Sequence, residues 1–386
     1  MSILRAVFLL FPLATALAAA QQEDAVVRAH RLFQAGRYAD AVELLTPALE
    51  KDAERADAQA LLGYAYFELE RYDEARAALN HALALGRMTP ALLSRLAHIA
   101  LQKERLPHAV NSLRLAGLLA PDDNDVQQAA ADAAAQAGLS DEALAGYRDI
   151  LKVDPARADV WLRAGNLHLR AGRNADALRM LLTGYHLGGS SAPLERTLAE
   201  LLVDAGNARA AVDFYERLLS RKPVDRAALE LRCARLLAAA GDGAGAQARA
   251  MKLSTGGDPA LAGDAHVLLG QLAAARGVLD KAFTHWRKAA RNGRVSPDVD
   301  AWLGSYLRRK GEHAAAVEHL RRRLQAGPWD ARIAGNLVAS LIATRDFEGA
   351  RKELLALLER TGLDDRTRGL IASLARAGRT IHKKQS

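Results

Sequence analysis

The sequence is poor in several residue types that mark particular classes of protein. Its 386 residues include one cysteine, Cys233, so no disulfide can form within the chain. Aromatic residues make up only 5%, which suits a core of closely packed small side chains. An HExxH sequence is absent, and the glycines at 241, 243 and 245 lack the lysine of a phosphate-binding loop. These absences argue against a disulfide-stapled fold, a zinc protease of this type and a P-loop nucleotide-binding protein.

The sequence also lacks an apolar run long enough for a comfortable membrane span. The apolar run at residues 6–20 follows Arg5 and ends in the small residues Ala18-Ala19-Ala20. This pattern predicts a signal peptide over residues 1–20, cut before Gln21, with a retained N-terminal anchor as the alternative. No cysteine lies near the predicted cleavage site, so the sequence excludes a lipoprotein anchor. We therefore expect a periplasmic or secreted protein that is not an integral membrane protein.

What the sequence does contain is a repeated pattern of small residues. One alanine recurs every 34 to 36 residues, at Ala41, Ala75, Ala109, Ala143, Ala177, Ala211, Ala246, Ala282, Ala316 and Ala350. Another small residue recurs twelve positions earlier in nearly every copy, as Gly165 does before Ala177. A turn residue, usually glycine, lies five positions before the alanine. Glu70, Glu104 and Arg345 stand at that turn in three copies.

Residues 158–187 show what one copy encodes. Two helical patterns are separated by Ala171-Gly172-Arg173-Asn174, in which Gly172 ends the first helix and Asn174 starts the second. Gly165 and Ala177 are small where the two helices meet. The copy therefore predicts a hairpin of two helices in close contact, which buries its apolar faces only by stacking on further copies.

A 34-residue helix–turn–helix period of this kind resembles the tetratricopeptide repeat. The residues that carry the resemblance include Leu62-Gly63, Tyr66, Tyr72 and Ala75 in the second copy, and Trp161, Gly165 and Ala177 in the fifth. It covers residues 22–361 and implies an all-α fold: a right-handed α-solenoid of about ten repeats over residues 21–361. We expect a capping helix over 362–378, closed by Gly378 with Leu370, Ile371 and Leu374 on one face, and a disordered basic tail over 379–386.

The seventh repeat has the weakest pattern. Its second helix opens with three glycines, and each interior glycine costs about 1 kcal/mol relative to alanine. Its packing residue Ala250 stands where neighbouring repeats have Tyr215 or Trp286. We predict a softer joint over residues 241–263.

The resemblance further implies that the first helices of the repeats line a concave groove that binds protein or peptide partners. The outward positions combine aromatic with polar residues, a composition that suits peptide capture. The predicted groove residues are His30, Phe33, Tyr64, Phe67, Glu68, His98, Gln102, Gln128, Asp132, Gln136, Asn166, Arg170 and Arg196. Some members of the family grip a terminal carboxylate with a lysine and an asparagine. Leu162 stands where that lysine would be, which argues against such a clamp.

Charge divides the chain into two parts. Residues 21–154 contain 14 Lys and Arg against 21 Asp and Glu, a net charge of −7, whereas residues 155–386 carry +14. Two basic clusters in the ninth repeat predict an anion-binding site formed by Arg308, Arg309, Lys310, Arg321, Arg322 and Arg323. Because an exported protein does not meet chromosomal nucleic acid, the expected anions are those of the envelope: a polysaccharide, phospholipid head groups, peptidoglycan or an acidic protein surface.

The residues that could support chemistry are isolated from one another. His285 and His319 occupy equivalent positions in successive repeats, so they are either neighbours across the stack or separate helix positions, and a zinc site needs further ligands. Cys233 sits at a packing position without a catalytic context. Trp161 and Trp286 lie on packing faces, while Trp302 and Trp329 fit either the core or a binding surface. We predict no catalytic residue, no cofactor and no metal.

Two functions remain for such a chain. The first is a non-enzymatic scaffold or adaptor that binds protein partners in the bacterial cell envelope, in assembly or secretion. The second is a polysaccharide-export or cell-wall component that binds an anionic glycan through the basic C-terminal half.

Overall fold

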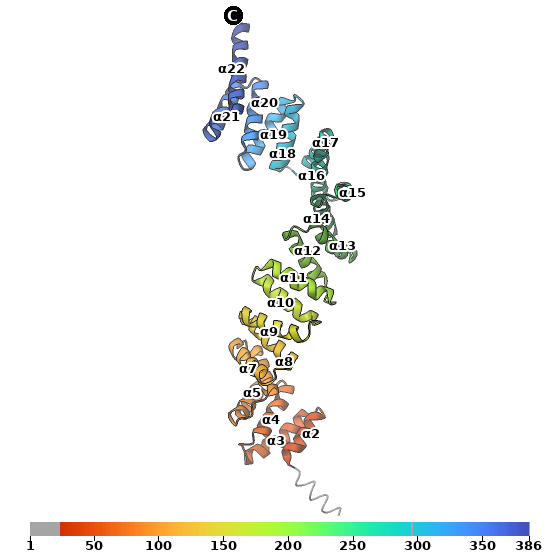
Figure 1. The fold of residues 1–386 in the computed structure, drawn as a ribbon, viewed down its shortest axis with the longest axis vertical. Coiled ribbons are helices and arrows are strands. Elements are labelled where there is room, and N and C mark those ends of the chain that lie inside the picture. Colours follow the sequence, from red (N-terminus) through yellow and green to blue (C-terminus); the bar gives the residue numbers. More distant parts are fainter. Residues whose placement is uncertain (1–23, 295, 386) are drawn as a thin grey trace, which may run out of the picture. The chain divides into compact units, whose positions relative to one another are not determined.

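The computed structural model describes residues 24–294 and 296–385, so the predicted signal peptide lies outside the described residues. Within them, the chain forms 21 α-helices and no strand. Consecutive helices pack in pairs along the chain (Figure 1). The predicted all-α solenoid of helical hairpins is confirmed.

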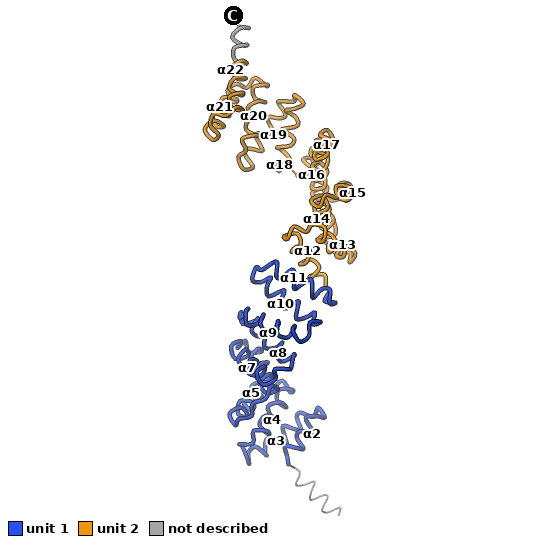
Figure 2. The backbone as a smooth tube through the Cα atoms, in the orientation of Figure 1, with its two compact units in different colours: residues 1–190 blue, residues 191–386 orange. Residues whose placement is uncertain are grey.

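The chain divides into two compact units, residues up to Ser190 and residues from Ser191 onward (Figure 2). Unit 1 contains α2 (Ala25–Gln34), α3 (Tyr38–Lys51), α4 (Ala56–Glu68), α5 (Tyr72–Ala84), α6 (Pro90–Gln102), α7 (Leu106–Leu119), α8 (Asn124–Gln136), α9 (Ser140–Val153), α10 (Ala158–Arg170) and α11 (Asn174–His186). The boundary between the units follows the fifth hairpin. The repeat pattern predicts a single domain of ten repeats and gives no sign of this division.

Unit 2 contains five hairpins and a final helix. Its helices are α12 (Ala192–Asp204), α13 (Ala208–Ser220), α14 (Arg226–Ala239), α15 (Gly243–Ser254), α16 (Pro259–Ala275), α17 (Leu279–Arg291), α18 (Pro297–Arg309), α19 (His313–Ala326), α20 (Ala331–Ala343), α21 (Phe347–Thr361) and α22 (Asp365–Gln385). In both units the even-numbered helix up to α20 is the first helix of a repeat, and the odd-numbered helix is the second.

The small residue of the first helix lets the two helices of a hairpin approach closely. A Cβ atom added at Gly165 would lie 2.7 Å from the side chain of Leu181, and one added at Gly304 would lie 2.7 Å from Leu320. The repeated alanines of the second helix, such as Ala177 and Ala316, are fully buried where the two helices of the hairpin pack together. The close approach predicted from residues 158–187 is confirmed.

The turn between the two helices requires a left-handed backbone conformation. Gly172 adopts φ 70°, and Glu104 and Arg345 adopt φ 56° and 65° at the same place in their repeats. Glycine reaches this region without the steric cost of a Cβ, which is roughly 1–2 kcal/mol for other residues. Packing of the flanking helices therefore holds Glu104 and Arg345 in a conformation that their own side chains disfavour.

The last helix differs from the prediction. α22 does not end at Gly378 but continues to Gln385, because a glycine inside a helix is tolerated at a modest cost. It packs on α20 and α21 through Leu370 and Leu374, as a capping helix does. Ile371, which was placed on the same face, is instead 38% exposed.

Among its described residues, the protein contains no helix that is both long and apolar enough to cross a membrane.

Candidate partner-binding surface

The first helices of unit 1 bring the predicted groove aromatics together. The ring centroids of Phe33 on α2 and Tyr64 on α4 are 6.5 Å apart. Phe67 on α4 and His98 on α6 are 5.2 Å apart in an edge-to-face arrangement. We call Phe33, Tyr64, Phe67 and His98 the aromatic row. His98 is exposed, and the other three rings are half-buried. These three rings pack against the core and also present apolar surface to solvent.

An arginine that the sequence analysis missed belongs to this row. The guanidinium of Arg95 on α6 lies 4.5 Å from the ring centroid of Tyr64 and 5.5 Å from that of Phe67. It also forms a 3.2 Å ion pair with the predicted groove residue Glu68. Arg95 lies three residues before His98, a helical spacing that places both on one face and that would have identified it.

A second group of predicted residues lines a cavity of about 260 Å³ between α8, α9 and α10. Asp132 and Gln136 contribute from α8, and Asn166 and Arg170 contribute from α10. Tyr147 and Arg163, which the sequence analysis did not single out, complete the wall. We call this cavity the polar pocket.

Hydrogen bonds inside the polar pocket satisfy its carboxylate. The Tyr147 hydroxyl donates to Asp132 at 2.6 Å, and Arg163 forms a 2.9 Å ion pair with the same carboxylate. Burial, together with the bond to Asp132, raises the pKa of Tyr147 well above its usual value, so the phenol stays a proton donor. Asn166 and Arg170 are exposed and make no hydrogen bond or ion pair with any described residue. These two side chains are therefore available to a ligand.

The remaining predicted groove residues are not gathered into either group. His30 and Gln102 are exposed on α2 and α6. Gln128 is half-buried and accepts a hydrogen bond from Arg157. Arg196 belongs to unit 2, where it forms a 2.9 Å ion pair with Asp225.

The six predicted anion-binding residues make separate contacts. Lys310 pairs with Asp280 at 2.9 Å, and Arg322 pairs with Glu318 at 2.8 Å and Asp300 at 3.1 Å. Arg323 donates to a backbone carbonyl. Arg308 is half-buried, and Arg309 and Arg321 line two different cavities. Internal carboxylates already neutralise part of this charge, so the six do not form one shared surface of unpaired cations.

The histidines and the cysteine show local pairing. The Nδ1 atoms of His285 and His266 are 3.2 Å apart within one hairpin, whereas His319 contacts Asp300 at 2.6 Å in the next. Each histidine thus pairs within its own hairpin. Burial raises the pKa of the Cys233 thiol to about 11, which keeps it protonated and unreactive. No group of three potential metal ligands occurs among the described residues.

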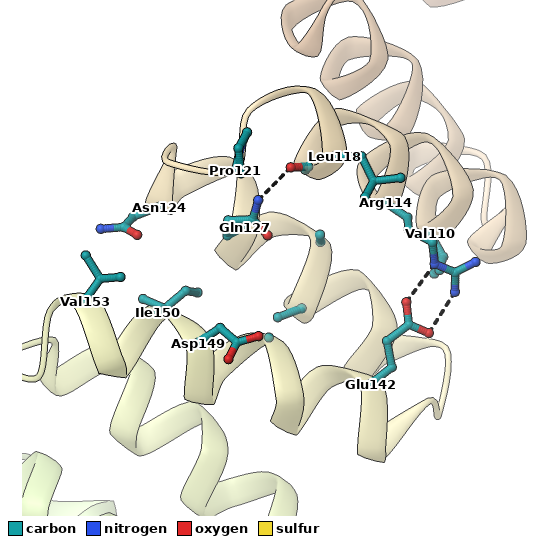
Figure 3. Close-up of a pocket in the computed structure, with 14 residues that line it drawn as sticks. Val110, Arg114, Leu118, Pro121, Asn124, Gln127, Glu142, Asp149, Ile150 and Val153 are labelled. Carbon is teal, nitrogen blue, oxygen red and sulfur yellow. Dashed lines mark hydrogen bonds and ion pairs between the residues drawn. The ribbon is translucent and has the colours of Figure 1, made fainter.

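A cleft between second helices also escaped the sequence analysis. Residues of α7, α8 and α9 enclose a cavity of about 500 Å³, which we call the α7–α9 cleft (Figure 3). Leu118 and Val153 at its rim are 74% and 75% exposed. Gly146 lines the cleft in close contact with Ala131, where the fifth and sixth repeats have Met180 and Phe214. At one end Arg114 forms two hydrogen bonds with Glu142, 2.8 and 2.7 Å long.

Comparison with known proteins identifies the repeat. Two models of the tetratricopeptide repeat match the sequence, one over residues 32–94 and 307–374 and the other over residues 128–185. No curated protein matches it.

Solved structures that resemble the chain are repeat proteins of low sequence identity. YrrB, described as a TPR protein with an unusual peptide-binding site, is 24% identical over 50% of this chain and 96% of its own, with a TM-score of 0.43. The pilF protein of Pseudomonas aeruginosa is 19% identical over 57% and 98% of the two chains, also with a TM-score of 0.43. A tetratricopeptide repeat protein from Parabacteroides merdae is 20% identical over 65% and 98%, with a TM-score of 0.38.

The family matches fall on hairpins whose turn, small residue and packed alanine the structure confirms. Such repeats generally form non-enzymatic scaffolds for protein interactions. The chain belongs to the tetratricopeptide-repeat family.

Proposed function

We propose that the protein is a non-enzymatic scaffold that holds an extended segment of a protein partner on the first helices of unit 1. The observation that carries this proposal is the polar pocket, where Asn166 and Arg170 remain without partners while Asp132 is satisfied internally. An asparagine amide both donates to and accepts from a peptide backbone, and an arginine donates to a carbonyl or a carboxylate. The aromatic row supplies apolar contact for neighbouring side chains of the same segment.

We further propose that the partner is met in the bacterial cell envelope, in assembly or secretion. The basis is the charged, apolar and small-residue order of residues 1–20, which is that of a signal peptide. N-terminal sequencing of the protein recovered from cells should begin at Gln21, and fractionation should place it outside the cytoplasm. Recovery of the intact N-terminus in the cytosolic fraction would contradict export.

The role of the polar pocket is tested by removing its two unpartnered side chains. We expect Asn166→Ala with Arg170→Ala to weaken partner binding by roughly 30-fold to 700-fold, since each of the two lost hydrogen bonds contributes about 1–2 kcal/mol. A suitable measurement is the affinity for a partner first captured from an envelope extract. Because both side chains are exposed, the fold and its circular dichroism should not change.

The matched control carries the same two changes on second helices. Asn80 on α5 and Arg148 on α9 are exposed and make no side-chain hydrogen bond or ion pair with another described residue, so Asn80→Ala with Arg148→Ala should bind the partner normally. Equal binding by the two double variants would remove the polar pocket from the proposal.

The aromatic row is tested by Tyr64→Ala with Phe67→Ala, which should reduce recovery of the same partner. Tyr64→Phe keeps the ring and loses only a 3.3 Å contact between the hydroxyl and Thr89, so it should leave recovery unchanged. Unchanged recovery with both rings removed would exclude the row from the binding surface.

A further inference from the structure

The cleft between second helices occurs again in unit 2 with different chemistry. Residues of α19, α20 and α21, together with Trp329, enclose a cavity of about 450 Å³, which we call the α19–α21 cleft. It occupies the same place in the repeat as the α7–α9 cleft. Arg321 lies five residues after the repeated Ala316, as Arg114 lies five residues after Ala109, and both arginines line their clefts. The two clefts can therefore be compared position by position.

The decisive difference is the carboxylate that faces the arginine. In the α7–α9 cleft Glu142, the residue before the repeated Ala143, forms a two-bond fork with Arg114 (Figure 3). In the α19–α21 cleft the corresponding residue before Ala350 is Gly349, which also lines the cavity. Arg321 is exposed and has no ion pair with any residue that the structure describes. The cleft of unit 2 thus keeps the arginine and lacks its partner.

Two further differences change the charge in the same direction. Asp149 of the first cleft corresponds to Ala356 in the second, and Val153 corresponds to Arg360. Lys352 adds a third cation to the lining, and Glu353 is the one carboxylate of the described wall. The Arg360 guanidinium lies 5.1 Å from the ring centroid of Trp329, which restrains a side chain that would otherwise be mobile.

We propose that the α19–α21 cleft binds a carboxylate from an acidic segment of a protein partner, with Arg321 in the two-bond geometry that Arg114 makes with Glu142. The choice of a glutamate-like carboxylate rests on that internal example, in which a glutamate side chain occupies the equivalent place. Lys352 and Arg360 add attraction for further acidic residues of the segment. This surface lies on second helices of unit 2, so it is separate from the proposed groove on the first helices of unit 1.

The test uses a fluorescein-labelled peptide of six glutamates and the full mature chain, with fluorescence anisotropy as the readout. We expect saturable binding with one peptide per chain, and binding that weakens as salt increases, because the contacts are exposed ion pairs. A peptide of six glutamines should not bind. Equal binding of the two peptides would overturn the proposal.

Gly349→Glu is the sharpest variant, because it supplies the carboxylate that the first cleft already has. It should weaken peptide binding at least about tenfold, the loss expected when a charge-assisted fork is occupied internally. The new Cβ would lie 2.5 Å from an oxygen of the Asp346 side chain, whose carboxylate accepts from the Gly349 backbone N–H and caps the helix. Moving that side chain aside weakens the cap, at a cost of about 1 kcal/mol. Glutamate also suits this third helical position, where it can bond back to the start of the helix.

A second variant keeps the test valid whether or not Gly349→Glu folds well. Arg321→Ala should abolish binding, whereas Arg309→Ala, an exposed arginine outside the cleft, should leave it unchanged. The reciprocal change Glu142→Gly frees Arg114 in unit 1, but Asp149 remains and no other described cation lines that cleft, so it should add only a weaker second site for the peptide. Binding unaffected by both Gly349→Glu and Arg321→Ala would place the peptide elsewhere and overturn the assignment.

Two competitors decide whether the ligand is a protein carboxylate. Inorganic phosphate and an anionic glycan should displace the peptide only at salt-like concentrations. If either binds the cleft more tightly than the glutamate peptide, the proposed occupant is wrong. The Asn166→Ala with Arg170→Ala variant should bind the glutamate peptide normally, so the result is independent of the groove in unit 1.

Discussion

Units 1 and 2 repeat the same helical hairpin but fill one position between its helices differently. This interhelix position lies four residues before the small residue of the first helix. In unit 1 its occupants are neutral: Ala25, Gln59, Leu93, Gln127 and Trp161. In unit 2 four of the five are ionisable: Glu195, Glu230, His266 and Asp300, followed by Ala334.

Each of these four ionisable side chains at the interhelix position has a partner from its own repeat. Glu195, 2% exposed, pairs with Arg221 at 2.7 Å. Glu230 pairs with Arg249. The other two are the contacts of His266 with His285 and of Asp300 with His319. The hairpin therefore accepts a charge at this position when a second polar group faces it. The interhelix position should make unit 2 depend on pH and charge, whereas the neutral residues at the same position in unit 1 should not.

The largest expected effect comes from breaking one of these pairs. Asp300→Ala should lower the free energy of unfolding of unit 2 by about 2–3 kcal/mol, because the buried carboxylate accepts from both His319 and Arg322. The expected loss is smaller than that for a fully buried ion pair because the Arg322 side chain is 43% exposed. Hydrogen exchange of peptides from α18 and α19 measures the loss.

The same change in unit 1 is the control. Gln59 is buried, but its amide makes only a 3.4 Å hydrogen bond to the Ala53 carbonyl, so Gln59→Ala should cost about 1 kcal/mol or less. Equal losses for Asp300→Ala and Gln59→Ala would mean that charge at the interhelix position does not distinguish the units.

A second pair of variants tests how each unit packs around its small residues. Gly270→Ala should destabilise the hairpin of α16 and α17 by about 2 kcal/mol, because the added Cβ would lie 2.2 Å from the Trp286 indole nitrogen. Trp286 is itself stacked on Trp302, with ring centroids 4.9 Å apart, so it has little room to move.

Gly165→Ala in unit 1 meets a more adaptable neighbour. Its Cβ would lie 2.7 Å from the Leu181 side chain and 3.1 Å from the Leu181 backbone nitrogen. The aliphatic side chain can turn and the backbone must shift only slightly, so about 1 kcal/mol is expected. Thermal unfolding compares the two variants. A greater loss for Gly165→Ala than for Gly270→Ala would show that the tryptophan contact is not the tighter one.

The histidine pair predicts a smaller, pH-dependent effect in unit 2. Burial lowers the pKa of both His266 and His285, with the nearby Lys288 adding to it. Above about pH 6.5, the usual histidine value, both states are neutral and the stabilisation is complete. As pH falls below 6.5 the unfolded chain binds protons that the folded hairpin does not, so the free energy of unfolding decreases.

Urea unfolding at pH 7 and pH 5 measures this decrease. His266→Gln, which copies the residue of unit 1 at Gln59, should reduce the difference between the two pH values. His168 in unit 1 also has a pKa lowered chiefly by burial, so His168→Gln is the matched control for unit 1. A pH difference that stays the same in His266→Gln would assign it to other groups.

The smallest effect concerns the joint predicted at residues 241–263. There α15 buries only Ala246 and Ala250, whereas α13 of the previous repeat buries six residues that include Phe214 and Tyr215. Amide exchange in α15 should be faster than in α13 by a modest factor, since less apolar area opposes local opening. Equal protection of the two helices would contradict the prediction.

The fold could be predicted from the sequence because it depends on local, repeated signals. Small residues such as Gly165 and turn residues such as Gly172 recur at one period, so each copy of the pattern predicts the same helical hairpin. Glu104 and Arg345 could be assigned to the same turn only by their position in the repeat period, since nothing about those side chains favours a left-handed backbone.

The candidate sites were predicted only where a helical face was enough. Asn166 and Arg170 share a face by their spacing, and they line one pocket. Ion pairs between repeats escaped because their partners are far apart in sequence, as Arg114 and Glu142 are at a separation of 28 residues. A net charge of +14 over residues 155–386 likewise does not show which arginines are neutralised by nearby carboxylates. Arg322 forms an ion pair with Asp300, whereas Arg321 forms none with any described residue.

The most direct test of the proposed groove is photo-crosslinking of the intact protein in cells. A crosslinking amino acid at position 166 should join the partner in the envelope fraction, and one at position 80, on a second helix of the same unit, should not. Crosslinking from position 80 alone, or none from position 166, would show that the first helices of unit 1 are not the partner-binding surface.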